Sequence, residues 1–239
     1  MINTGWVGMA PPKTRRPYCS PQREARAGAT RKQVLRAATT LFDERGYAGT
    51  TIRSVAAKAK VSVPTVETLF GTKARLLKAT IDVAIAGDDR PVPMLARDWA
   101  TAAIETTDIE TFLSIVAGVL APAQGRSSGL VLSVFEGAGS DPELASLAVQ
   151  MSAQRATMAT WVVDRLTALG ALHDEISQDE AVDTLFALME PALFDRLTRQ
   201  RAWTLAHYEH WVARSLRCLL VSDAGQRRQL STNPRRSPT

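Results

Sequence analysis

The sequence predicts an all-α protein, and three observations support this fold class. Alanine and leucine are abundant while aromatic residues make up only 6% of the chain, a composition that favours helices. Apolar residues recur at helical spacing along most of the sequence. Capping residues precede these segments and glycines follow several of them. With 239 residues, 45% of them hydrophobic, the chain can form one medium domain or two small ones.

Four helices are expected in the first third. The first begins at Thr30, a capping residue with Gln33 as its partner, and ends at Gly46, where a left-handed conformation is needed. The next three are expected over residues 50–59, 62–71 and 72–87, each opened by Ser or Thr. The second and third are short, and the fourth carries a continuous apolar stripe.

The remaining residues divide into more helices and two polar terminal segments. Further helices are expected over residues 94–106, 109–121, 127–138, 141–170, 177–199 (bent at Pro191) and 205–222. Residues 1–29 and 223–239 lack periodicity and predict a disordered basic arm and a disordered basic tail. We expect the domain boundary near residue 78, inside the fourth helix, which separates a domain over 30–78 from a larger one over 79–222.

Charge divides the chain unevenly. Residues 30–78 hold ten basic and three acidic residues, and residues 79–222 hold ten basic and nineteen acidic. A surface that only keeps a protein soluble would not be divided in this way, whereas a surface that binds a polyanion would be. Membrane surfaces and acidic partners attract similar basic patches. A nucleic acid is the favoured partner.

Three short basic helices in this order predict a helix-turn-helix unit. In such a unit the third helix lies in the major groove and must be apolar on one side and small and polar on the other. Around the expected third helix, Val63, Val66, Leu69 and Phe70 form the apolar side, which leaves Pro64, Thr65, Glu67 and Thr68 outward. The two threonine side chains can reach base edges or phosphates, while Arg53, Lys58, Lys60 and Lys73 can neutralise phosphates.

Residues 30–77 resemble the N-terminal domain of the TetR family of bacterial transcriptional regulators. The resemblance rests on Thr30 to Tyr47 (TRKQVLRAATTLFDERGY), Thr50 to Ala56 (TTIRSVA), Val61 to Val66 (VSVPTV) and Phe70 to Leu77 (FGTKARLL). It covers about a fifth of the chain, and the larger domain carries no recognisable motif. A helical ligand-binding and dimerisation domain after the helix-turn-helix is what this family implies.

The resemblance further implies a function and its partners. The protein would be a homodimer, joined through its last two helices, with Leu216 on the apolar face of the last one, and would bind double-stranded DNA at a palindromic operator. A small apolar or amphipathic effector among the middle helices would shift the fourth helix and lower the affinity for DNA. The protein would then be a repressor that the effector releases.

Contacts with DNA can be carried over only where the residues match. The family positions at Thr50, Thr51 and Lys73 match, whereas Lys60, Pro64 and Glu67 replace the glycine, small residue and aromatic residue that are common there. The candidate DNA-binding residues are therefore Thr50, Thr51, Arg53, Ser62, Val63, Pro64, Thr65, Glu67, Thr68 and Lys73. Glu67 could accept from cytosine amino groups, help reject other sites, or pair with a nearby Arg or Lys. Glu67 and Lys60 also favour the alternative of a helical small-molecule-binding or interaction protein whose helix-turn-helix no longer reads DNA.

The sequence gives little support for an enzymatic or metal-binding function. No arrangement of nucleophile, base and acid is present, so the protein is not expected to be an enzyme, and neither a cofactor nor a metal site is expected. His207 and His210 lie on one helical face without a third ligand. The aromatic and methionine residues that could line an adaptable pocket are Trp99, Phe112, Phe135, Met158, Trp161, Phe186 and Met189. The cysteine pattern and the absence of a long apolar run favour the cytoplasm and no membrane partner.

Overall fold

The structure, a computed structural model, describes residues 21–222 and is all-α, as predicted. Its helices are α1 (Pro21–Gly49), α2 (Ile52–Lys58), α3 (Val63–Phe70), α4 (Lys73–Ala86), α5 (Asp98–Glu105), α6 (Ile109–Gly137), α7 (Pro142–Ala168), α8 (Gln178–Leu188), α9 (Pro191–Asp195) and α10 (Leu205–Leu220). A 3-10 turn, η1 (Met94–Ala96), and a π-helical turn, η2 (Arg196–Gln200), complete the set. Within this range no strand forms and no helix is long and apolar enough to cross a membrane.

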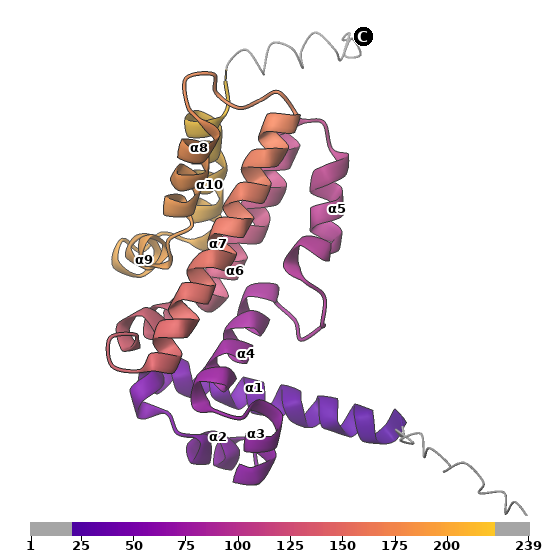
Figure 1. Ribbon diagram of the computed structural model, residues 1–239, viewed down its shortest axis with the longest axis vertical. Coiled ribbons are helices and arrows are strands. Elements are labelled where there is room, and N and C mark those ends of the chain that lie inside the picture. Colours follow the sequence, from indigo (N-terminus) through magenta and orange to yellow (C-terminus); the bar gives the residue numbers. More distant parts are fainter. Residues whose placement is uncertain (1–20, 223–239) are drawn as a thin grey trace, which may run out of the picture.

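The helices form a long body with a small head at one end. The two longest helices of the body, α6 and α7, run side by side along its length, and α8, α9 and α10 lie against one side of them (Figure 1). Helix α5 lies at the opposite side in this view. Helices α1, α2 and α3 form the head, and α4 leads from the head to the body.

Two apolar cores hold these parts together. The first core joins the inner faces of α1 to α4 with one end of α6 and α7; from these last two helices it takes Leu130, Val131, Val134, Leu144, Leu147 and Met151. The second core joins the other parts of α6 and α7 with α8, α9 and α10. The expected boundary at residue 78 falls in the middle of α4, whose Ile81 is fully buried in the first core. The head therefore shares its core with the body.

The start of the first helix was predicted wrongly in part. Residues 21–29, expected to belong to the disordered arm, form the first turns of α1. The stretch is rich in Ala and Arg, which are strong helix formers, and Pro21 stands at the first helical position, where its missing N–H has no intrahelical partner. Residues 1–20 of the expected arm and the whole of the expected tail over 223–239 lie outside the described residues.

Other expected helices of the body also differ from the prediction. The one expected over 94–106 divides at Arg97, whose backbone is extended, into η1 and α5. The helices expected over 109–121 and 127–138 are one helix, α6, which continues through Pro122. Proline removes one intrahelical hydrogen bond, but buried residues on both sides of it, among them Ala117 and Leu130, keep the helix in the core. The helix expected over 177–199 divides into α8, α9 and η2, and the break falls just before Pro191, where a bend was expected.

Candidate functional site

The helix-turn-helix unit has the predicted caps. Thr51 caps α2 in a reciprocal capping box with Ser54, and the Ser62 side chain accepts a hydrogen bond from Thr65 N at 3.2 Å at the start of α3. Pro64 stands in the first turn of α3, where no intrahelical donor is required. These local signals set the start of both helices, and therefore the position of the face that α3 presents.

The turn between α2 and α3 places a lysine in a conformation that glycine adopts more easily. Lys60 has φ 50°, and its N–H bonds to Ala57 O at 3.1 Å. A residue with a Cβ in this region costs about 1–2 kcal/mol relative to the right-handed region. Because Lys60 stands where the family commonly has glycine, the backbone of this turn is strained.

The outward face of α3 is the predicted one. Pro64, Glu67 and Thr68 are exposed and Thr65 is half-buried, while Val66 and Phe70 are buried. The Thr68 hydroxyl donates to Pro64 O at 2.7 Å, so its oxygen remains free to accept from a base amino group. The Thr65 and Ser62 hydroxyls lie 2.7 Å apart, so one of them donates a hydrogen bond to the other. This face is small and polar, as a helix that enters a groove requires.

Glu67 has no basic partner in the described part of the chain. Its side chain is exposed, and no ion pair or hydrogen bond joins it to another residue among 21–222. Three explanations were open for this acid. One of them, pairing with a nearby Arg or Lys, is not found among the described residues. Contact with cytosine amino groups and rejection of other sites stay as predictions.

Thr50 does not point outward, contrary to its place among the candidate DNA contacts. Its side chain is fully buried, and the hydroxyl lies 3.0 Å from Leu41 O and 2.8 Å from Gly46 O. It satisfies carbonyls at the end of the first helical run, where Gly46 takes φ 65° as predicted. The exposed neighbour is Thr51. Thr50 therefore positions the start of α2 and cannot touch DNA.

Lys73 is half-buried and held within the protein. Its ammonium group donates to Tyr47 O at 3.0 Å and lies 3.8 Å from the centre of the Tyr47 ring. Burial lowers the pKa of Lys73, while the nearby Asp141 carboxylate acts in the opposite direction. The remaining N–H groups of Lys73 could still reach a phosphate. Arg53, Lys58 and Lys60 are exposed and form no ion pair among residues 21–222.

A contact that the sequence did not reveal joins the head to α7. The Tyr47 hydroxyl donates to Asp141 Oδ2 at 3.1 Å, and Asp141 is also the N-cap of α7. Burial and this hydrogen bond raise the pKa of Tyr47 to about 12. Although desolvation opposes it, hydrogen bonds from Leu144 N and Tyr47 hold the pKa of Asp141 below its usual value. Lys73, Tyr47 and Asp141 thus link the start of α4 to the start of α7.

A cavity of about 1100 Å³ lies along the other half of α4. Its walls come from α4, α6, α7, the segment 88–95 that follows α4, and the first turns of α1. Three of the predicted pocket residues, Phe135, Met158 and Met189, border it. Val83, Leu120, Val131, Met151 and Arg155 also border it, and no sequence signal distinguished them from ordinary core residues.

The other four predicted pocket residues lie elsewhere. Phe112 is fully buried in the second core. Trp99 and Trp161 pack edge to face, with ring centres 5.4 Å apart, and Trp161 borders a separate recess of about 440 Å³. The Phe186 ring lies under the guanidinium of Arg155, 3.9 Å from its carbon. Aromatic character alone could not separate core packing from the cavity wall.

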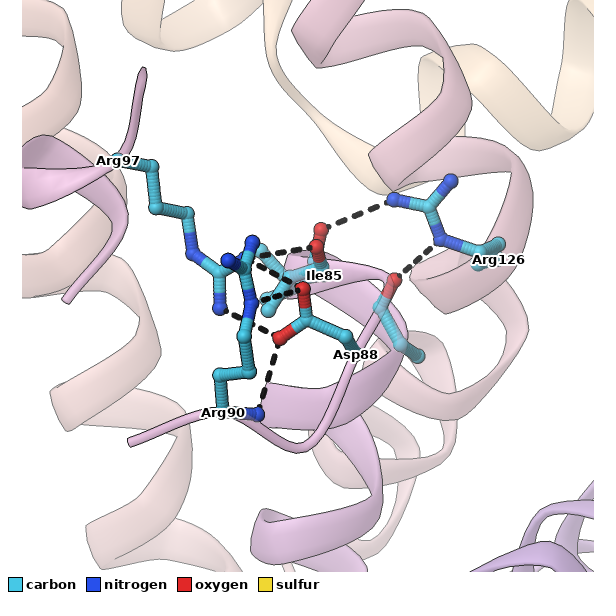
Figure 2. A network of polar contacts seen from close by, with 7 residues as sticks. Ile85, Asp88, Arg90, Arg97 and Arg126 are labelled. Atoms are coloured by element: carbon cyan, nitrogen blue, oxygen red, sulfur yellow. Dashed lines mark hydrogen bonds and ion pairs between the residues drawn. The ribbon is translucent and has the colours of Figure 1, made fainter. Parts of the chain in front are cut away.

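A polar network fixes the end of α4 beside the cavity (Figure 2). Arg126 of α6 donates to Ala84 O at 2.7 Å and to Ile85 O at 3.1 Å, so it satisfies carbonyls of the last helical turn. Asp88 accepts from both terminal nitrogens of Arg97, each at 3.0 Å. These hydrogen bonds, with those from Arg90, hold the pKa of Asp88 well below its usual value.

Gly87 joins α4 to this network in a conformation that favours glycine. Its φ is 82°, and a Cβ atom would stand 3.2 Å from Nη2 of Arg126. The left-handed conformation favours glycine, and a larger residue would also have to displace the guanidinium slightly. α4 therefore starts at the head beside Lys73 and ends in a fixed turn at the cavity. Within residues 21–222 no three His, Cys, Asp or Glu side chains gather in a way that could hold a metal ion.

Residues 34–80 match the family profile described as bacterial regulatory proteins of the tetR family. The segment is a TetR-type helix-turn-helix domain. A curated HTH-type transcriptional repressor of Mycobacterium tuberculosis is 51% identical over 49 residues, which are 20% of this chain and 26% of that protein. The match to curated relatives is thus confined to the TetR-type domain.

Solved structures extend the likeness to the fold of most of the chain. A putative TetR-family regulator from a Rhodococcus species has a TM-score of 0.62 at 16% identity, over 81% of this chain and 99% of that one. A putative transcriptional regulator from Saccharomonospora viridis in complex with choline has a TM-score of 0.60 at 16% identity, over 82% and 99%. At this identity the likeness shows that the body has the fold of such regulators.

Proposed function

We propose that this protein is a ligand-responsive, sequence-selective regulator of transcription, acting in the cytoplasm as a repressor. The observation that carries the proposal is the path of α4. This helix starts beside the TetR-type head, where Lys73 contacts Tyr47, and its second half borders a cavity large enough for a small molecule. A ligand that prefers one position of α4 would therefore shift the head.

The DNA-contacting surface is proposed to be the outward face of α3 with the start of α2. Thr65, Thr68 and Glu67 would lie at base edges, while Arg53 and Thr51 would contact the phosphate backbone. Ser62, Val63 and Pro64 would form the leading end of α3 against the groove wall. Lys73 would add a phosphate contact through its remaining N–H groups. The exposure of this face and the basic residues around it support the assignment.

Selection of bound duplexes from a random pool tests this directly. We expect one palindromic sequence to emerge, and Thr65→Ala with Thr68→Ala to abolish the preference for it while binding to random DNA persists through phosphate contacts. Thr101→Ala, at an exposed position on α5, is the matched control and should change nothing. Equal affinity for the selected and the random duplex at physiological salt would contradict the proposal.

A second function is favoured by one observation. Glu67 places on the outward face of α3 a carboxylate that has no partner among residues 21–222, and a phosphate would be repelled there. The protein could then bind a small molecule or a partner without reading DNA. In that case the random-pool selection would yield no sequence, and the two threonine substitutions would leave DNA binding unchanged.

The homodimer is proposed to form through α8 and α10. Leu205 and Leu219 of α10 are 42% and 48% exposed and stand two heptads apart, so they lie on the same face of the helix. Leu216, in contrast, is fully buried in the second core, so it is no interface residue, contrary to the expectation. Two such subunits would place their α3 helices on the two halves of a palindrome.

Two neighbouring substitutions test the interface. Leu219→Glu should give a folded monomer in sedimentation at micromolar concentration, because the charge would be buried between subunits. Leu216→Glu should instead unfold the body, because it places an unpaired charge in a core. A wild-type protein that sediments as a monomer would rule out the dimer.

A further inference from the structure

The cavity lies between the two apolar cores, and its wall includes residues of both. Val83, Val131 and Met151 in its wall pack in the first core, which holds the head, whereas Leu120 and Met189 pack in the second. A molecule that fills this space would touch both cores at once. Its volume of about 1100 Å³ lies just above the usual range of small-molecule sites, so it has room for a long or bulky occupant. Its many apolar wall residues favour an apolar one.

The cations beside α4 are already matched by acids of the same wall. The cationic wall residues are Arg31, Lys32, Lys78, Arg90, Arg97 and Arg155, and the acidic ones are Asp82, Asp88 and Asp89. Lys78 pairs with Asp82, Arg31 pairs with Asp89, and Arg97 and Arg90 share Asp88. Lys32 is exposed at the rim. A ligand would gain little by contacting the cations that are already paired.

Arg155 of α7 differs from these. Its acidic partner in the described part of the chain is Glu190, 2.6 Å from Nη1, and Glu190 is not part of the cavity wall. A guanidinium has five N–H donors, so one carboxylate oxygen leaves most of them without an acceptor. The buried Nε of Arg155 is one of these, since it has no hydrogen-bond partner among residues 21–222. Nε of Arg97 has none there either, but both terminal nitrogens of Arg97 already donate to Asp88 of the same wall. The wall thus holds spare donors at this position.

The side chain of Arg155 is also held in place before any ligand arrives. Its guanidinium lies over the Phe186 ring at 3.9 Å, and the side chain as a whole is 12% exposed. A fixed charge in a poorly solvated site binds an opposite charge more strongly than a mobile charge in water does. On α7, Met151 precedes Arg155 by four residues and Met158 follows it by three, so the three side chains share one helical face.

We propose that the effector is a long, apolar molecule with a single acidic head group. The acid would lie against Arg155, and the apolar chain would extend past Met151 towards Val83 of α4. This rests on the proposed function, because it names the ligand class of the cavity through which α4 is thought to respond. The acid would occupy the spare donors of Arg155, and the chain would bridge the two cores.

The probes are three molecules with the same hydrocarbon chain and different heads. Dodecanoate, methyl dodecanoate and dodecyltrimethylammonium are titrated into the full-length protein below their micelle-forming concentrations, with calorimetry as readout. Charge-assisted hydrogen bonds predict that dodecanoate binds about ten- to a hundredfold more tightly than the ester. The ammonium probe should bind no better than the ester. Equal or tighter binding of the ammonium probe overturns the proposal, as does a failure of all three to bind.

Variants locate the head group. Arg155→Met keeps the apolar stem and should remove the preference for dodecanoate over the ester. Lys32→Met removes one positive charge from the same wall and should leave that preference within about threefold. An undiminished preference in Arg155→Met overturns the assignment. If Arg155→Met fails to fold, Arg155→Lys serves instead and should keep the preference at reduced affinity, because the charge stays and the fork is lost; an affinity equal to wild type would overturn the role of Arg155.

The outcome is separable from that of the proposed function. A wild-type protein that selects an operator but binds none of the probes retains its function as a DNA-binding regulator and loses this ligand class. A protein that binds dodecanoate through Arg155 but selects no DNA sequence retains the ligand class and loses the regulatory role. The two failures therefore cannot be confused.

Discussion

The two ends of α4 are held in different ways. At the cavity, Arg126 donates to two carbonyls of the last turn, and the following residues are fixed by the paired hydrogen bonds between Asp88 and Arg97. At the head, Lys73 donates a single hydrogen bond to Tyr47 O, and the Tyr47 hydroxyl reaches Asp141 at 3.1 Å. Charged donors thus fix the cavity end, whereas the head end is held to the body by the shared apolar core and by the described hydrogen bond from a neutral donor, the Tyr47 hydroxyl. The difference indicates that the head end can yield first when α4 is displaced.

The largest effect is expected at Gly87. Gly87→Ala forces a Cβ into a left-handed residue and towards Arg126, which should destabilise the protein by about 2 kcal/mol. For a chain of this size the thermal midpoint would fall by about 4–8 °C. Gly139→Ala, where a Cβ meets nothing within 4 Å, is the control and should have little effect. A change at Gly87 no larger than at Gly139 would show that this end is not fixed as described.

A smaller effect with a defined pH dependence is expected at Asp88. The folded-state pKa of Asp88 lies below its unfolded value of about 3.9, so its charge stabilises the fold above that value. The contribution is lost as the pH falls through the folded-state pKa. In thermal melts, Asp88→Asn should therefore be less stable than wild type from pH 7 down to about 5, and the gap should close on further acidification. A gap that widened in acid would contradict this account.

A still smaller stability change is expected at the head end. Tyr47→Phe removes only the hydrogen bond to Asp141, which corresponds to about 1 kcal/mol. Its effect on signalling should be larger than its effect on stability, because this bond joins the head to α7. We expect ligand binding to be unchanged in calorimetry, while the ligand-dependent change in DNA affinity becomes smaller. A full response in Tyr47→Phe would place the coupling elsewhere.

The smallest change is expected in the turn before α3. Lys60→Gly relieves the strain of φ 50°, and the greater entropy of glycine in the unfolded chain offsets part of this gain. The net stabilisation should therefore be no more than about 1 kcal/mol. Lys60→Ala removes the same charge but keeps the strained conformation. A chemical denaturation curve should therefore separate the two variants, with glycine the more stable. Equal stability would mean that the turn is not strained.

Contacts between residues close in sequence were predictable, and contacts between distant residues were not. The caps at Thr51, Ser62 and Asp141 and the outward face of α3 follow from residues within a few positions of one another. The contact between Tyr47 and Asp141 spans 94 residues, and no local pattern pairs two such residues. Thr50 shows that a local match can also mislead. Its position matches a DNA contact of the family, but its side chain is buried and so cannot make that contact.

The sequence predicted the type of side chain that lines the cavity, but not which residues line it. Its large apolar residues look like any core residue in sequence, because cavity walls and cores share the same side chains. Met158 and Met189 were expected and Phe112 was not distinguishable from them, although it lies in the second core. Arg155 gave no signal at all, since its role depends on Glu190 and Phe186 as spatial neighbours.

The central claim is that occupancy of the cavity changes DNA affinity through α4. The most direct measurement is the dissociation constant of the selected duplex, followed by fluorescence anisotropy as dodecanoate is raised to the concentration that saturates the protein in calorimetry. We expect the constant to rise at least about fivefold and then level off, as a coupling between two sites requires. An unchanged constant at saturation would contradict the claim.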